Sequence, residues 1–263
     1  AYGTKNPVGV AIYETNLGTN NGSAPQSVVN STVASVGAGV ATANHMLMML
    51  RDLGVKTQSM FALSEYTNPF TNPANNEETT PLWGTVVDMG VTNLKRPQFL
   101  GEQLANSAIL PTMLTTRQTG DNPTWNQPLS ANDQIQLNNA QYLQSYAFTD
   151  GTNQSVVVFN LSRTRSLPVK FTGGNGPTGT VNVRQLTSAN ITDTNENSPT
   201  VNITNSTVNG TNPGTTYTLP PFSMTVLLWP GTAHAGATSS TRLTAAPQTI
   251  APGQNVSLKA VVD

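Results

Sequence analysis

The sequence predicts an α/β unit followed by an antiparallel β-sandwich, so the expected fold class is α/β plus all-β. Within residues 7–63, strand-like, helical and strand-like patterns follow one another, which is the order of a βαβ unit with parallel strands. Beyond residue 111 no helical periodicity returns. Short alternating runs separated by Gly, Asn and Pro take over, and these are typical of a sandwich.

The first predicted strand ends in a carboxylate. Val8, Val10 and Ile12 alternate with small residues, which is typical of a parallel strand buried on both faces. Glu14 follows directly, before a polar loop rich in Asn and Gly. Parallel sheets place their chemistry at the C-terminal ends of the strands. Glu14 is therefore either a functional carboxylate or a solvated loop residue, and its position alone leaves both interpretations open.

One long helix is expected over residues 24–53, because apolar residues recur there at three- and four-residue steps. Gly37 and Gly39 in its middle either allow close packing or mark a break. Gly54 is the expected C-terminal cap of this helix.

The second strand of the unit is expected over residues 55–63. Glu65 follows it in the position that Glu14 has after the first strand, which makes it a secondary candidate, although a loop carboxylate is the better interpretation. A further helix is expected over residues 94–110, with Asn93 as its N-terminal cap. This helix completes the α/β part of the chain.

Seven short strands are expected in the remainder, and Asp150–Gly151 between two of them is a tight-turn signal. The strands cover residues 142–148, 155–160, 167–171, 180–186, 201–203, 217–219 and 224–229. Residues 232–240 are small and polar, which predicts a linker. Residues 241–263 contain two more strand patterns about a Pro-Gly turn, too few for a sandwich, so we expect the start of another domain.

Composition excludes several functional classes. Only 10% of the 263 residues are charged, against roughly 25% in an average soluble protein, and the formal net charge is −1. This gives no electrostatic attraction to nucleic acid or to an anionic membrane. There is no cysteine, and no apolar run reaches the ~20 residues that span a bilayer. An Asn- and Thr-rich chain of this kind suits an exported bacterial protein, secreted or at the cell surface.

No cofactor and no metal are expected, because the sequence contains no phosphate-binding loop, dinucleotide fingerprint or zinc motif. Asp193, Asn195 and Glu196 resemble oxygen ligands for calcium. They lack the alternating Asp/Asn loop with its Gly, so a turn is the better interpretation.

Four segments in order resemble clan A retaining glycoside hydrolases of families 39, 51 and 79. These families include xylosidases, arabinofuranosidases and heparanase-like glucuronidases. The segments are YETN (13–16), LWGTVVDMGVTNLKRPQFLGEQLAN (82–106), YAFTDG through VVVFNLS (146–162) and LPPFSMTVLLW (219–229).

The resemblance implies a domain order. Residues 1–110 would be the last two βα units of an incomplete (β/α)8 barrel, residues 111–231 the β-sandwich, and residues 232–240 a linker. Residues 241–263 resemble the start of a bacterial immunoglobulin-like repeat. The sequence looks like part of a longer chain, whose N-terminal barrel strands would be the missing partner of those present here. A half-open barrel should expose apolar surface along the first strand.

The resemblance also implies a chemistry. Glu14 matches the nucleophile of a retaining glycosidase, which cleaves O-glycosidic bonds of plant or microbial polysaccharides or oligosaccharides by double displacement. Tyr13, Asn16, Glu65 and Trp83 would line the carbohydrate site. The acid/base partner, about 5–5.5 Å from the nucleophile, would precede the first residue, so this chain alone is expected to be inactive.

Two other classes of function stay open. A carbohydrate-binding module needs exposed aromatic side chains on one face, whereas Trp83 and Trp125 fall in segments predicted not to be strands, and Trp229 falls on a face predicted to be core. A structural cell-surface protein fits the Asn- and Thr-rich composition and the repeat-like tail. It does not explain a strand that ends in Glu14.

Overall fold

The structure is a computed structural model. It describes residues 9–17, 25–64, 69–70, 78–79, 84–129, 136–172 and 176–231. The chain divides into two units, residues 1–231 and residues 232–263, and all the described residues belong to the first. Five features predicted above lie outside the described residues, namely Val8, Glu65, Trp83, the linker 232–240 and the immunoglobulin-like segment 241–263.

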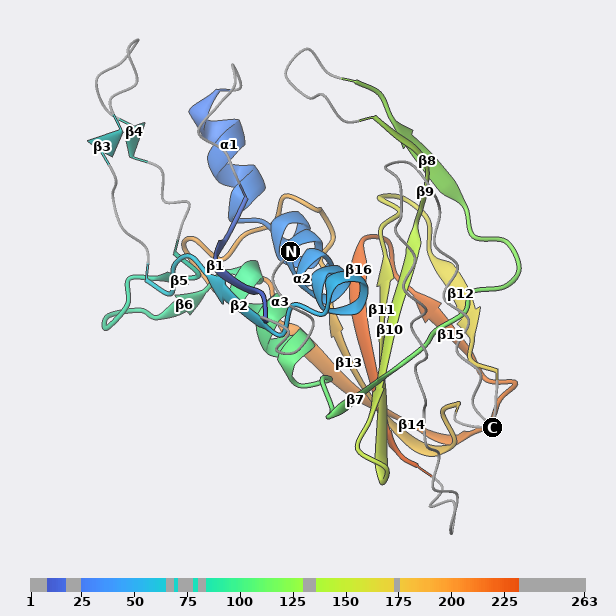
Figure 1. The fold of residues 1–263 in the computed structure, drawn as a ribbon. Helices are drawn as coiled ribbons and strands as arrows, with labels where there is room; N and C mark the ends of the chain where they lie inside the picture. The colour runs from blue at the N-terminus through green and yellow to red at the C-terminus, as the bar shows by residue number, and fades with distance from the viewer. Residues whose placement is uncertain are drawn as a thin grey trace, which may run out of the picture. The chain divides into compact units, whose positions relative to one another are not determined.

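Six antiparallel strands form the main sheet of the first unit, in the order β14-β13-β16-β11-β10-β7 (Figure 1). They are β7 Thr112–Leu114, β10 Leu143–Thr149, β11 Asn153–Asn160, β13 Gly179–Leu186, β14 Ile203–Thr211 and β16 Ser223–Pro230. A separate antiparallel pair consists of β12 Leu167–Lys170 and β15 Thr216–Leu219. All seven strands predicted for the sandwich are present, although β14 overlaps its predicted range only at Ile203.

The main sheet has a hydrophobic core on each face. On one face Tyr146, Phe148, Val157 and Val226 pack with residues of helices α2 and α3. On the other face the alternate residues of the same strands pack against the β12–β15 pair. These include Val156, Val158, Leu227 and Trp229, which are all buried. The predicted core position of Trp229 is therefore confirmed, and the helices share a core with the sandwich.

The helix predicted over residues 24–53 is broken in two, so that prediction was wrong. The structure has α1 (Gln26–Val33) and α2 (Val36–Leu53). The Ser35 side chain caps α2, and the first two backbone N–H groups of α2 donate to the carbonyl oxygens of Asp193 and Ile191, at 2.9 and 2.8 Å. Because these donors bind the loop between β13 and β14, they cannot continue the hydrogen-bond ladder of α1.

Gly39 in the first turn of α2 allows close packing of two helices. Helix α3 (Pro97–Asn106) crosses α2 where Gly39 and Gly101 meet. A Cβ added to Gly39 would lie 2.3 Å from the carbonyl oxygen of Pro97, and one added to Gly101 would lie 2.6 Å from that of Gly39. The two backbones are therefore in direct contact. At the other end of α2, Gly54 is the left-handed cap that the sequence predicts, with φ of 66°.

The second predicted helix is shorter than expected and begins later. Leu94–Lys95 form strand β6, which pairs with β5 (Val86–Val87). Asn93 has φ of 54° and its side chain accepts a hydrogen bond from the Gly90 N–H, so it closes the β5–β6 turn instead of capping α3. Arg96 is the N-cap, and the Pro that follows starts the helix.

The βαβ unit has the predicted parallel arrangement. Strand β1 (Ala11–Thr15) pairs in parallel with β2 (Thr57–Met60). The prediction that the first strand is buried on both faces was wrong, since Val10 is 66% exposed and Tyr13 is 84% exposed. Within the described residues β1 has no strand neighbour other than β2, so no described strand lies along its second edge.

Two further antiparallel pairs complete the described strands. β3 (Pro69–Phe70) pairs with β4 (Glu78–Thr79), and β8 (Thr124–Gln127) pairs with β9 (Leu137–Gln141). Trp125 therefore lies in a strand, contrary to the prediction. The other residues of its strand, Thr124, Asn126 and Gln127, are all polar, so the segment has no apolar alternation to detect. No helix among the described residues is long and apolar enough to cross a membrane.

The helix contact predicts a stability effect. Gly39→Ala forces α2 and α3 apart, because the added methyl group would overlap the Pro97 carbonyl. We expect it to lower the free energy of unfolding by about 1–3 kcal/mol or more. Urea denaturation measures this. Gly9→Ala is the control, since nothing lies within 4 Å of a Cβ at Gly9. Equal stability of the two variants would contradict the close approach.

A buried carboxyl on α3 predicts a pH dependence. Burial raises the pKa of Glu102 from 4.5 to about 7, and its Oε1 has no hydrogen-bond partner within the described residues. The folded state then holds a proton that the unfolded state releases, so stability falls as the pH rises from about 4.5 to 7. Because Gln does not titrate, Glu102→Gln should make this decrease in the free energy of unfolding smaller by up to roughly 3 kcal/mol. The unfolding midpoints of the unmodified chain and of Glu102→Gln, measured between pH 4.5 and 8, test this prediction. Equal changes with pH in the two proteins would contradict it.

Candidate active site

A β-bulge lies at the C-terminal end of β1. Between the paired positions Ile12–Gln58 and Thr15–Met60, β1 advances by three residues and β2 by two. The extra residue falls in the segment Tyr13–Glu14. Both side chains of this segment are exposed, whereas Thr15 is buried. Bulges re-aim side chains at strand ends and are common next to active sites.

The bulge changes the face on which Glu14 would otherwise lie. The Gln58 side chain donates to the carbonyl oxygen of Met46 on α2 at 2.9 Å, so this face of the pair is the helix side. Its cross-strand partner Ile12 shares that face, and in a regular strand Glu14 would too. With the extra residue, Thr15 takes the helix side instead. Glu14 is thereby left exposed at the strand end.

Asn16 ties the ends of the two strands together. Its side-chain N–H group donates to the Phe61 carbonyl oxygen, and its Oδ1 accepts from the backbone N–H of Leu17 at 2.7 Å. The Phe61 N–H donates to the Thr15 carbonyl oxygen at 3.1 Å. These three hydrogen bonds therefore fix the backbone that directly follows Glu14.

Residues 62–64, which follow β2, are held in place by Thr85 and Val86, which precede β6 in the sequence. Backbone N–H groups of Thr85 and Val86 donate to carbonyl oxygens of the segment 62–64, at 2.9 and 2.8 Å, and Ser64 forms a parallel bridge with Val86. Glu65 directly follows this crossing in the sequence, and Trp83 shortly precedes it. Both lie outside the described residues, so their predicted place beside Glu14 stays a prediction.

A buried arginine holds this segment against the loop between β13 and β14. The Arg96 side chain is fully buried. Its Nε and Nη2 donate to Oε1 and Oε2 of Glu196 at 2.7 and 2.8 Å, a bidentate ion pair, and its Nη1 donates to the Gly84 carbonyl oxygen. Its backbone N–H donates to the Thr85 carbonyl oxygen at 2.8 Å. Sequence reasoning missed Arg96, because neither spacing nor periodicity identifies an ion pair between residues that are 100 positions apart in the sequence.

The other polar residues of the β13–β14 loop also serve the fold. The buried Asn195 side chain donates to the carbonyl oxygens of Lys95 and Val201, each at 2.8 Å. Asp193 accepts hydrogen bonds from the Ser188 hydroxyl and from Asn190, which hold the pKa of its carboxyl below the usual range. The segment that resembled calcium ligands thus forms a turn. In the described parts of the chain, no three His, Asp or Glu side chains are grouped as a metal site.

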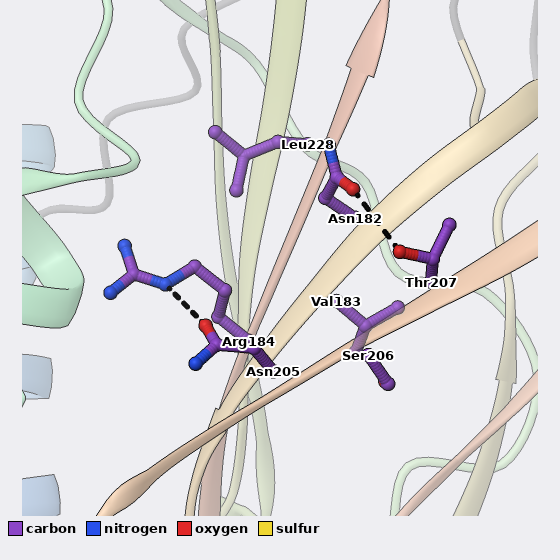
Figure 2. Close-up of a pocket in the computed structure, with 7 residues that line it drawn as sticks. All are labelled: Asn182, Val183, Arg184, Asn205, Ser206, Thr207 and Leu228. Atoms are coloured by element: carbon purple, nitrogen blue, oxygen red, sulfur yellow. Dashed lines mark hydrogen bonds between the residues drawn. The ribbon is translucent and has the colours of Figure 1, made fainter.

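A hollow with a volume of about 400 Å³ lies elsewhere, over strands β13, β14 and β16. Figure 2 shows its polar side chains bound to one another. Arg184 donates to Asn205 at 3.1 Å, and Thr207 donates to Asn182 at 3.4 Å. Because these groups satisfy each other, the hollow is a weaker candidate than the end of β1.

Comparison with known proteins identifies the fold. No family model matches the sequence, and no curated protein matches it. The structure is similar to the family 51 glycoside hydrolase α-L-arabinofuranosidase of Thermotoga petrophila RKU-1, with a TM-score of 0.62 and 19% identity over 84% of this chain and 43% of that one. It is also similar to the α-L-arabinofuranosidase of Thermotoga maritima in its arabinose complex, with a TM-score of 0.57 and 20% identity over 74% of this chain and 38% of that one.

The likeness recurs in the family 51 arabinofuranosidase of Xanthomonas axonopodis pv. citri, with a TM-score of 0.52 and 16% identity over 74% of this chain and 35% of that one. This chain therefore spans less than half the length of the proteins it matches. At such identities the similarity shows the fold, which is that of part of a family 51 glycoside hydrolase.

The buried ion pair predicts a large stability effect. Glu196→Gln leaves the Arg96 guanidinium buried without its counter-charge, and we expect it to cost about 3–5 kcal/mol in urea denaturation. Hydrogen exchange at the Thr85 and Val86 amides should accelerate as well. Asp52→Asn is the matched control, because the Arg51–Asp52 pair is solvent-exposed and should cost at most about 1 kcal/mol. Similar losses in the two variants would contradict the anchoring role.

Proposed function

We propose that this chain belongs to a retaining glycoside hydrolase of clan A and that Glu14 is its catalytic nucleophile. The observation that carries the proposal is an exposed carboxylate at a bulged, hydrogen-bonded strand end, within a fold similar to part of the family 51 arabinofuranosidases. The proposed substrates are O-glycosides of plant or microbial polysaccharides or oligosaccharides.

The chemistry would be a double displacement. The Glu14 carboxylate attacks the anomeric carbon as the bond to the leaving oxygen breaks, and a second carboxylic acid gives that oxygen a proton. This leaves a glycosyl ester on Glu14. Water, deprotonated by the second carboxylate, then attacks the same carbon and releases Glu14 as a free carboxylate. The net anomeric configuration is retained, and neither a metal nor a cofactor takes part.

The neighbouring residues have distinct proposed roles. Tyr13 is 84% exposed beside Glu14 and would contact the sugar directly. Asn16 binds the Phe61 carbonyl, so it would act on the substrate site chiefly by positioning Glu14. Glu65 and Trp83 keep the substrate-binding roles that the resemblance implies.

The proposal places the chain within a larger catalytic domain. Residues 1–110 would supply the last two βα units of a (β/α)8 barrel, and residues 111–231 the sandwich that packs on them. The remaining strands, with the acid/base residue, would come from the part of the relatives' length that this chain does not span. We further propose a secreted or cell-surface bacterial protein, with residues 241–263 starting an immunoglobulin-like repeat after the linker 232–240.

The alternative is a non-catalytic carbohydrate-binding or structural surface protein. Under that alternative Glu14 would be a solvated residue, and its substitution would not affect any hydrolytic activity of a longer form of the protein.

Azide rescue tests the role of Glu14. In a form of the protein extended to a complete barrel, Glu14→Ala should abolish hydrolysis of aryl glycosides, with aryl α-L-arabinofuranosides tested first because the similar structures are arabinofuranosidases. Added azide can then attack the anomeric carbon in place of the carboxylate. It should restore release of the aryl group and give a glycosyl azide of inverted configuration, which NMR identifies.

Glu65→Ala is the matched control, since Glu65 follows the neighbouring strand. It should weaken substrate binding without producing an inverted azide. Full activity of the Glu14→Ala protein, or an inverted azide from the Glu65→Ala protein, would contradict the assignment. The 263-residue chain alone should show no turnover, because the proposed proton donor would belong to the part of the relatives' length that this chain does not span.

A further inference from the structure

The β8–β9 hairpin presents a pair of stacked aromatic side chains. The Trp125 and Tyr142 rings lie 5.1 Å apart between centroids, with 28° between their planes. Trp125 pairs across the hairpin with Ala140. Tyr142 is two residues further along the chain, so it is the diagonal neighbour of Trp125 on the same face.

An exposed leucine extends this apolar row. Leu137 pairs with Gln127, two residues beyond Trp125, and so lies on the same face of the hairpin. It is 47% exposed, and both aromatic side chains are half-buried. We name the row formed by Leu137, Trp125 and Tyr142 the aromatic face. It is distinct from the two cores of the main sheet, which contain none of its three residues.

The base of the hairpin is fixed to the main sheet. Asn122 Oδ1 accepts from the backbone N–H of Leu143, the first residue of β10, at 3.1 Å, and Gln118 Nε2 donates to the Leu143 carbonyl oxygen at 3.0 Å. The Tyr142 N–H donates to the Pro123 carbonyl oxygen at 2.9 Å. The rings are therefore held in place before any ligand binds, which lowers the entropic cost of binding.

The polar groups around the aromatic face are neutral amides. Asp121 is the sole charged residue among the described positions 118–129 and 136–145. Amide side chains are frequent in the same segments, at Gln118, Asn122, Asn126, Gln127, Gln136, Asn138, Asn139 and Gln144, whereas Gln141 lies on the opposite face of the hairpin. Such a surface offers many paired donors and acceptors and only one charged side chain within these described ranges.

These features together match the chemistry of a neutral sugar. A sugar ring has an apolar face of C–H groups, which packs on the electron-rich face of an aromatic ring, and a rim of hydroxyls that exchange hydrogen bonds with amides. We propose that the aromatic face binds a neutral polysaccharide chain. This site goes beyond the proposed hydrolase function and does not depend on Glu14.

Affinity electrophoresis of the 263-residue chain tests the proposal. Native gels would contain soluble arabinan, arabinoxylan, xylan or mixed-linkage β-glucan as separate probes. We expect at least one polysaccharide to retard the protein. Trp125→Ala should weaken that binding by roughly 30-fold, the loss typical of an aromatic anchor. Trp125→Tyr should retain most of it, because the ring face is kept.

Three controls separate this site from other effects. Gln141→Ala should bind like the unmodified chain, because Gln141 pairs with Thr124 on the opposite face. Glu14→Gln reports separately on the hydrolase proposal, since retardation that is lost in Glu14→Gln but kept in Trp125→Ala would come from the proposed active site and would contradict binding at the aromatic face. Leu137→Asn changes an exposed side chain, so it should weaken binding without loss of folding even if Trp125→Ala does not fold.

The proposal is overturned if none of the four polysaccharides retards the chain, or if retardation is the same in the Trp125→Ala and Leu137→Asn variants. It is also overturned if sedimentation shows that these two variants abolish self-association while glycan binding is absent, because the aromatic face would then be a protein interface.

Discussion

The ion pair between Arg96 and Glu196 is the constraint on which the α/β part of the structure depends. It joins the N-cap of α3 to the loop between β13 and β14, and both of its charge-assisted bonds form where the guanidinium has no contact with water. A buried guanidinium is costly unless every donor is satisfied. The Gly84 carbonyl accepts a hydrogen bond from a further guanidinium N–H, so this arrangement of the two segments offsets the cost of burying the charge.

From this ion pair a series of contacts leads to the candidate catalytic residue. Arg96 holds the segment of Gly84 and Thr85, and that segment holds the chain leaving β2. Phe61 in that chain binds Thr15 and Asn16, the two residues directly after Glu14. The contact of the α2 N-terminus with the same loop and the glycine crossing of α2 and α3 complete the attachment. The sandwich thus contributes to the proposed active site by fixing the strand ends that carry it.

Local patterns predicted much of this arrangement. Alternation found the seven sandwich strands, and the strand-helix-strand order found the parallel pair with Glu14 at its end. What escaped prediction depends on tertiary contacts. The break before α2 exists because its first N–H groups bind the Ile191–Asp193 segment, and the bulge at Glu14 depends on the register with β2. Neither the Arg96 ion pair nor the Trp125–Tyr142 stack has a local signal in the sequence.

Covalent labelling of the nucleophile tests the central claim most directly. A form of the protein extended to a complete barrel would be incubated with a 2-deoxy-2-fluoro glycoside bearing a good leaving group, which lets the glycosyl ester form but slows its hydrolysis. Mass spectrometry of the digested protein should then find the fluorosugar on the peptide that contains Glu14, bound to that residue. A label on any other carboxylate, Glu65 included, would contradict the account.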